Sequence, residues 1–255
     1  MDNKKELMKG RLIEMTQRIS APAERVWQAW ADPARISQWF VDRAEGGLIP
    51  GTTYKLSWDK FNFTVPYKVE EAEPGKLLTL SAPTPHGRLG ISELVFEQDG
   101  EETIVRMVNA GFKDGAEWED EYQGIVSGWH GTFAVLKLYV ERYFGKPKQG
   151  ITALRPAPFE FGAVYPWLAS GERRKRWLAP FGPQEPAEVM ALTNREVLLR
   201  WPEIEGEIEL KAFAWGGGTR MLGLRVISWS DDSQGLAQRE GEANEALGRL
   251  AALLS

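Results

Sequence analysis

Histidine is the side chain best suited to proton transfer near neutral pH, and the chain has two histidines. His130 falls inside an expected helix, and Lys137 and Glu141 on its side of that helix are typical of a solvent-facing flank. His86 lies within residues 83–87, where two prolines and a glycine indicate a loop. We expect both histidines at the surface, although a loop at a cavity mouth can still contribute to function.

Paired carboxylates can act as general acid and base, and the sequence has three acidic clusters. They are Glu70-Glu71, Glu101-Glu102 and the run from Glu117 to Glu121. The last precedes an expected helix and stabilises the positive end of its dipole. The sequence shows no carboxylate among inward aromatic positions, no metal-ligand spacing and no nucleophile elbow. It therefore predicts no catalytic residue, no metal site and no cofactor.

Aromatic residues are the remaining candidates, because they can line an apolar cavity. Period-two alternation places Tyr54 and Trp58 on one face of a strand, and the series from Phe61 to Val69 on one face of the next. Such a face forms either an ordinary core beneath a helix or the wall of a ligand cavity. In the second case the expected ligand-binding residues are Trp39, Trp58, Phe61, Phe63, Tyr67, Trp129 and Phe133.

The elements that must position these residues follow from periodicity. Alternation predicts a strand over 11–19, and the sequence from Ser20 to Glu24 predicts a helix start, followed by a second short helix that ends near Phe40. Five further strands are expected at 53–58, 61–71, 76–82, 89–97 and 103–109. Apolar residues at steps of three and four predict a long helix over 118–144. The fold class is therefore α+β, with an antiparallel sheet and a long C-terminal helix across it.

The second half of the chain repeats the first. Residues 26–40 align without a gap on residues 164–178, and a similar helix stripe recurs near the C-terminus. The hairpin 207–229 is expected to match 92–109, so that the second copy has lost about 22 residues, comparable to one hairpin. We predict a complete domain at 1–148 and a reduced copy at 151–255, the reduced copy packing solid or against the first. Pro166 is expected to begin or kink its helix, and the glycines 216–218 to form a turn.

Composition bounds the function. The formal net charge is −5, which disfavours nucleic acid as a partner, and the basic run 173–176 is expected on a solvated helix face. Cysteine is absent, so thiol chemistry and disulfides are excluded. The sequence shows neither a signal peptide nor a membrane span, and it predicts a cytoplasmic protein.

The first half resembles the SRPBCC or START-like superfamily, and within it the family of homologues of the activator of the heat-shock-protein-90 ATPase. The resemblance rests on residues 19–27, Gln38 to Phe40, the hairpin Glu93 to Val108, and Gly128-Trp129 followed by Leu136, Leu138 and Tyr139. It implies a helix-grip fold, here duplicated in tandem. It leaves function open, because members bind apolar ligands, cyclise polyketides, or hydroxylate with attached iron domains.

Three function classes are therefore expected, in this order. The first is non-enzymatic binding of a small apolar molecule in a cavity between sheet and long helix of the first domain. The second is a chaperone-associated or other protein-interaction role, which the family name suggests. The third is a cyclase-like or hydrolytic enzyme.

Overall fold

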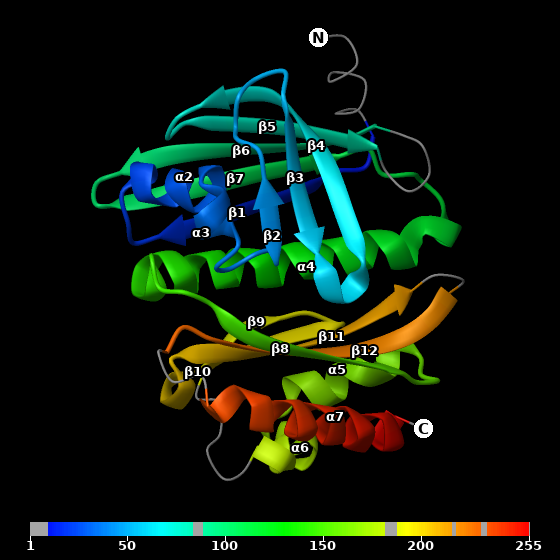
Figure 1. The fold of residues 1–255 in the computed structure, drawn as a ribbon. Coiled ribbons are helices and arrows are strands. Elements are labelled where there is room, and N and C mark those ends of the chain that lie inside the picture. Colours follow the sequence, from blue (N-terminus) through cyan, green and yellow to red (C-terminus); the bar gives the residue numbers. More distant parts are fainter. Residues whose placement is uncertain (1–9, 84–88, 182–187, 216–217, 231–233, 255) are drawn as a thin grey trace. The chain divides into compact units, whose positions relative to one another are not determined.

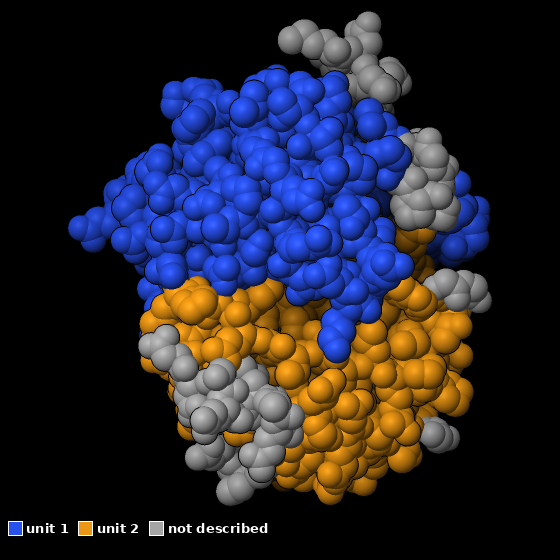
Figure 2. Space-filling view, in the orientation of Figure 1, with its two compact units in different colours: residues 1–119, 135–145 blue, residues 120–134, 146–255 orange. Residues whose placement is uncertain are grey.

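The computed structural model describes residues 10–83, 89–181, 188–215, 218–230 and 234–254, without the side chains of 234–238. His86 and two of the glycines 216–218 lie outside the described residues. The chain divides into two compact units, coloured separately in Figure 2. Unit 1 comprises Met1–Glu119 and Val135–Gly145, and unit 2 comprises Asp120–Ala134 and Lys146–Ser255. The boundary expected between residues 148 and 151 remains a prediction.

Unit 1 contains one antiparallel sheet and the helices that cover it (Figure 1). Its elements are β1 (Ile13–Ile19), α2 (Ala23–Ala31), α3 (Pro33–Ile36), β2 (Arg43–Glu45), β3 (Thr53–Trp58), the 3₁₀ turn η1 (Asp59–Phe61), β4 (Phe63–Glu73), β5 (Leu77–Pro83), β6 (Leu89–Asp99), β7 (Glu102–Ala110), the 3₁₀ turn η2 (Ala116–Trp118), the end of α4 (Glu119–Leu138) and the π-helical turn η3 (Tyr139–Tyr143). The strand order is β1-β7-β6-β5-β4-β3-β2. The six expected strands are confirmed within two residues at each end, and so is the long helix when α4 and η3 are taken together, whereas β2 was not expected.

The strand register confirms the aromatic face of the β3–β4 hairpin. Tyr54 lies opposite Tyr67, and Trp58 lies opposite Phe63. Directly opposed residues of an antiparallel pair share a face, so these four rings are on one side of the sheet. Phe61 differs from the prediction, because it belongs to η1 and precedes the strand.

Helix α2 and the turn η3 complete unit 1. Trp27 of α2 packs edge-on against Phe96 of β6 at 5.5 Å between ring centroids. The predicted helix start is confirmed, but its capping hydroxyl is not: Pro22 occupies the N-cap position, and Ser20 Oγ donates to Glu102 Oε1 at 2.9 Å. The backbone N–H of Ser20 donates to Glu141 Oε1 at 2.7 Å, which ties η3 to the end of β1.

Unit 2 repeats this element order in a shorter form (Figure 1). Its elements are β8 (Gln149–Pro156), α5 (Phe161–Ala169), α6 (Gly171–Leu178), the 3₁₀ turn η4 (Ala179–Phe181), β9 (Glu188–Leu192), β10 (Glu196–Trp201), the 3₁₀ turn η5 (Pro202–Ile204), β11 (Gly206–Trp215), β12 (Thr219–Ser228) and α7 (Gln234–Leu254). The strand order β8-β12-β11-β10-β9 corresponds to that of unit 1 with two strands fewer. The fold is therefore α+β of the helix-grip type, with two antiparallel sheets. Pro166 lies inside α5, five residues after its start, and does not begin it.

The two faces of the unit 2 sheet differ in chemistry. One face and α5 to α7 enclose an apolar core that includes Trp177, Trp201, Leu224 and Leu247, all fully buried. The other face carries charged side chains of β10, β11 and β12, and residues 120–134 of α4 lie against it. A Cβ added to Gly131 of α4 would overlap Glu196 Oε1 of β10.

One loop occurs twice, once in each unit. In unit 1 a strand ends at Trp58, and the three-residue turn η1 follows and is capped by Asn62, whose φ is +46°. In unit 2 a strand ends at Trp201, and η5 follows and is capped by Glu205, whose φ is +48°. These are the two described residues other than glycine with a left-handed backbone.

Within the described residues, no helix combines the length and the apolar character that crossing a bilayer requires.

Candidate functional site

A row of aromatic rings in unit 1 forms the candidate binding site, and we call it the aromatic row. It runs through Trp30, Trp39, Phe40, Trp58 and Phe63. Successive ring centroids lie 4.9, 5.2, 5.4 and 5.8 Å apart. Separations of 4.5–7 Å are those at which aromatic pairs attract each other, so the row is one packed unit.

Local chain geometry brings these rings together. Helix α2 ends where Asp32 caps α3 by accepting a hydrogen bond from Ala34 N–H at 2.8 Å. The chain then turns, and Trp39 Nε1 donates to the carbonyl of Ala29 at 2.9 Å. The hydroxyl of Tyr54 donates to the carbonyl of Trp30 at 3.0 Å, which attaches the end of α2 to β3. Burial, with the nearby charge of Asp32, raises the pKa of Tyr54.

Exposure increases along the row. The Trp39 side chain is 1% exposed, Phe40 and Trp58 are half-buried, and Phe63 is 49% exposed. An exposed ring of this size costs hydrophobic free energy that a ligand covering it would recover. The row therefore connects the core of unit 1 to solvent by an unbroken aromatic path.

The structure places the predicted site residues in two groups. Trp39, Trp58 and Phe63 belong to the aromatic row, and Phe61 lies in the turn between the last two. Tyr67 lies four residues beyond Phe63 on β4, and burial raises its pKa to about 12. A neutral hydroxyl is therefore its form at all ordinary pH values.

Trp129 and Phe133 form the second group. Their ring centroids lie 6.1 Å apart on α4, in the stretch that belongs to unit 2. The single cavity expected from all seven residues remains a prediction.

Trp30 and Phe40 were not among the predicted site residues. Trp30 was expected in the first short helix, and Phe40 at the end of the second. Their role depends on the turn at Asp32-Pro33, which directs both toward Trp39. A search for aromatic residues on both sides of such a turn would have found them.

Unit 2 contains a second chemical feature, a buried set of three carboxylates that we call the carboxylate layer. Glu196, Glu207 and Glu209 are all at least 96% buried on the charged face of the sheet. Lys211 Nζ lies 3.0 Å from Glu209 Oε1, and Arg225 Nη2 lies 3.1 Å from Glu207 Oε1. Buried charges without such partners would be strongly unfavourable.

The three carboxyl groups differ in proton affinity. Burial raises the pKa of Glu196 well above its ordinary value and that of Glu207 to about 7. Burial also acts to raise the pKa of Glu209, but the charges of Arg225 and Lys211 outweigh it and hold the pKa at about 2. The ionised carboxylate of Glu209 adds to the raised pKa of Glu196, because it disfavours a second negative charge beside it.

Residues of α4 and the β9–β10 turn close the carboxylate layer. Ser127 and Thr193 share a hydroxyl hydrogen bond, and Ser127 Oγ donates to Glu196 Oε2 at 3.4 Å. Arg195 donates to the carbonyl of Asp120 at 2.8 Å and lies 3.7 Å from the ring centroid of Phe161. In the described part of the chain, no group of histidine, aspartate and glutamate side chains has the arrangement of a metal site.

His130 is exposed, as its helix position predicted. The basic run also lies on a mostly exposed helix, where Arg173 and Arg176 stack on Trp167 at 5.3 and 5.0 Å. Arg174 is the exception, because it donates to the carbonyl of Ala169 at 2.9 Å. This run thus caps and covers α5.

Comparison with known proteins agrees with this architecture. The model of the family "Activator of Hsp90 ATPase homolog 1-like protein" matches residues 20–141. This match supports the resemblance found in the sequence of the first half. The comparison with curated proteins found no match.

The solved structures to which the chain is similar include the following three. The Aha1 dimer of Colwellia psychrerythraea is 18% identical, over 53% of this chain and 100% of that chain, with a TM-score of 0.46. A protein of Mesorhizobium loti is 22% identical, over 52% and 98%, with a TM-score of 0.48. DynU16, from the dynemicin biosynthetic locus, is 17% identical over 96% of this chain and 100% of that chain, with a TM-score of 0.45.

Proposed function

We propose that the first half of the chain binds a small hydrophobic molecule, without catalysing its conversion, on the aromatic row. The graded exposure from Trp39 to Phe63 carries the proposal. A flat apolar ligand laid on Phe63 and Trp58 would extend a set of rings that already pack at 5.8 Å. Covering about 100 Å² of apolar surface contributes about 2.5 kcal/mol.

The carboxylate layer gives no support to a hydrolytic or cyclase-like reaction. Glu196, Glu207 and Glu209 are buried and form ion pairs with Lys211 or Arg225. A general acid or base must reach a proton of the substrate within hydrogen-bond distance.

The cytoplasmic location remains a prediction of the sequence.

The test uses Nile red, a neutral apolar dye that fluoresces in apolar surroundings. We expect saturable binding to the full chain, weakened at least tenfold by Phe63→Asp, because a carboxylate replaces the exposed ring. Val95→Asp is the matched control, since Val95 is also an exposed apolar residue of this sheet. Equal dye affinity of a folded Phe63→Asp variant and the parent would contradict the proposal.

A protein-interaction role is the second candidate, and the family description favours it. Absence of dye binding in the parent would overturn ligand binding and favour this role. The exposed Phe63 and Ile49 would then be the first contacts to test.

A further inference from the structure

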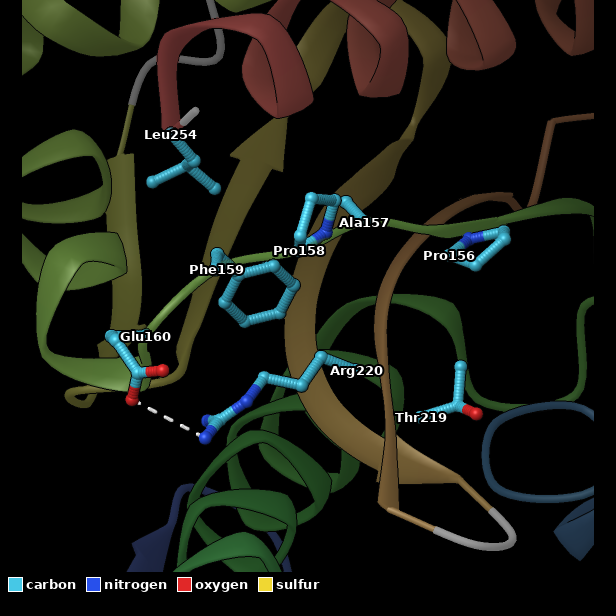
Figure 3. A pocket seen from close by; sticks show the side chains of 8 residues that line it. All are labelled: Pro156, Ala157, Pro158, Phe159, Glu160, Thr219, Arg220 and Leu254. Atoms are coloured by element: carbon cyan, nitrogen blue, oxygen red, sulfur yellow. Dashed lines mark hydrogen bonds and ion pairs between the residues drawn. The ribbon is translucent and has the colours of Figure 1, made fainter.

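An open groove in unit 2 has a volume of about 820 Å³ (Figure 3). It lies where the end of β8 continues toward α5, beside the start of β12 and the last turn of α7. The lining residues are Pro156, Ala157, Pro158, Phe159, Glu160, Thr219, Arg220 and Leu254. It is separate from the aromatic row, which belongs to unit 1.

The groove has a firm apolar wall. Phe159 and Ala157 are buried, and Phe159 packs edge-on against Phe161 at 5.8 Å. The backbone N–H of Ala157 donates to the carbonyl of Arg220 at 3.1 Å, which joins the two sides of the groove. The flanking prolines restrict the backbone, so little conformational entropy remains to be lost on binding.

One positive charge stands at the side of this wall. The Arg220 guanidinium lies 4.4 Å from the ring centroid of Phe161, and its side chain is 27% exposed. Its Nη2 pairs with Glu160 Oε2 at 3.3 Å, across the dashed line in Figure 3. The Glu160 side chain is 85% exposed. Because surface ion pairs contribute at most about 1 kcal/mol, a ligand can displace Glu160 while Arg220 stays in place over the ring.

The hydroxyl of Thr219 is a further polar group of the lining. A cationic ligand would have to pair with Glu160. That carboxylate is mostly exposed, and the positive charge of Arg220 beside it would repel the cation. A ligand carboxylate would instead meet a partly buried guanidinium, whose fork matches two carboxylate oxygens. The charges therefore favour an anionic ligand.

We propose that this groove binds a small amphipathic carboxylate. Its carboxylate pairs with Arg220 in place of Glu160, and its apolar body lies along Pro158, Phe159 and Leu254. The binding is non-covalent and independent of the site proposed in unit 1.

Isothermal titration of the full chain with octanoate tests this proposal, with octanamide as the uncharged analogue. We expect Arg220→Gln to weaken octanoate binding at least tenfold and to leave octanamide binding unchanged. Glu160→Gln should tighten octanoate binding two- to fivefold, because it removes the competing carboxylate. Arg249→Gln is the matched control, since Arg249 is an exposed arginine of α7 paired with Glu245.

Leu254→Asp provides a second test at the chain end, should Arg220→Gln fail to fold. It places a negative charge in the apolar wall and should abolish octanoate binding. Octanoate affinity unchanged in folded Arg220→Gln or Leu254→Asp would overturn the proposal, as would the absence of binding by the parent. Loss of octanoate binding in Phe63→Asp together with full binding in Arg220→Gln would also overturn it, by locating the ligand on the aromatic row.

Discussion

Glu207 is a fully buried carboxyl group surrounded by charges from several strands. Arg225 of β12 pairs with it, Arg200 of β10 lies opposite in the register, and Glu209 and Lys211 follow on β11. Burial dominates, so the folded state holds a proton on Glu207 up to about pH 7. In an unfolded chain a glutamate releases its proton near pH 4.3.

This difference predicts a pH-dependent stability of unit 2. The contribution of Glu207 is fully present below pH 4.3 and is lost as pH rises through about 7, because the unfolded state releases the proton first. Glu196 acts in the same direction. We expect the free energy of opening, measured by amide hydrogen exchange of β10 to β12, to fall from pH 5 to pH 7 by up to about 1.4 kcal/mol per pH unit for each group.

Glu207→Gln should make this fall shallower, and Glu245→Gln on the exposed face of α7 should not change it. A slope in Glu207→Gln as steep as that of the parent would show that Glu207 does not hold the proton.

The carboxylate layer could not be predicted from the sequence. Glu207, Glu209 and Lys211 alternate with Ile208 and Leu210, a pattern typical of a strand with one solvent face. The hairpin was expected, but the alternation does not show that a helix segment more than 60 residues earlier packs against the polar face. Sequence periodicity separates the two faces of a strand but does not show what covers the polar one.

The elements themselves were largely predictable. Trp129, Phe133 and Leu136 define the long helix by their spacing, and the ends of β3 match the prediction because turn residues flank an alternating segment. The strand β2 was missed, since three residues, Arg43 to Glu45, are too few to show a period. Phe61 was assigned to a strand because the turn η1 interrupts the chain without a proline or glycine.

Helix α4 depends on a missing side chain at Gly131. A Cβ there would overlap Glu196 Oε1, whereas one at Gly128 meets nothing within 4 Å. We expect Gly131→Ala to lower the free energy of unfolding by about 1–3 kcal/mol, as overpacking usually does. The control Gly128→Ala should raise it by up to about 1 kcal/mol, because alanine favours a helix over glycine.

Urea denaturation followed by circular dichroism measures both changes. Adding Glu196→Ala to Gly131→Ala should restore part of the loss, which a general weakening of the helix would not allow. Equal effects of alanine at Gly131 and Gly128 would refute close packing at Gly131.

At the scale of the whole molecule, one helix belongs to two compact units. Residues 120–134 of α4 group with unit 2 and residues 135–145 with unit 1. Arg195, which is 4% exposed, holds the beginning of the helix through Asp120. Stability along α4 should therefore depend on different contacts in its two parts.

Arg195→Ala tests this division. We expect faster amide hydrogen exchange in residues 120–134 and unchanged exchange in the turn η3, because only the former loses its partner in unit 2. Arg249→Ala, which removes an exposed arginine, should change neither segment. Equal acceleration in both segments would indicate that α4 responds as a single unit.

The loop that occurs in both units also bears on how the shorter sheet arose. Under the predicted duplication, Trp58 corresponds to Trp201, an offset of 201 − 58 = 143, so β10 and β11 descend from β3 and β4. The first residues of β7 and β12 differ by 219 − 102 = 117. The two offsets differ by 143 − 117 = 26 residues, which is close to the length of residues 74–101, the β5–β6 hairpin with its turns. Under this correspondence β12 matches β7, as the sequence alignment expects, and β11 matches β4 instead of β6.

Excision of β5 and β6 together leaves β4 and β7 antiparallel, and they can pair directly. Loss of β5 or β6 alone would instead have left two parallel strands side by side, and the antiparallel pairing could not have been kept at that point. Under the predicted duplication, interior strands of such a sheet are therefore lost in pairs, and the loops that survive mark which pair is missing.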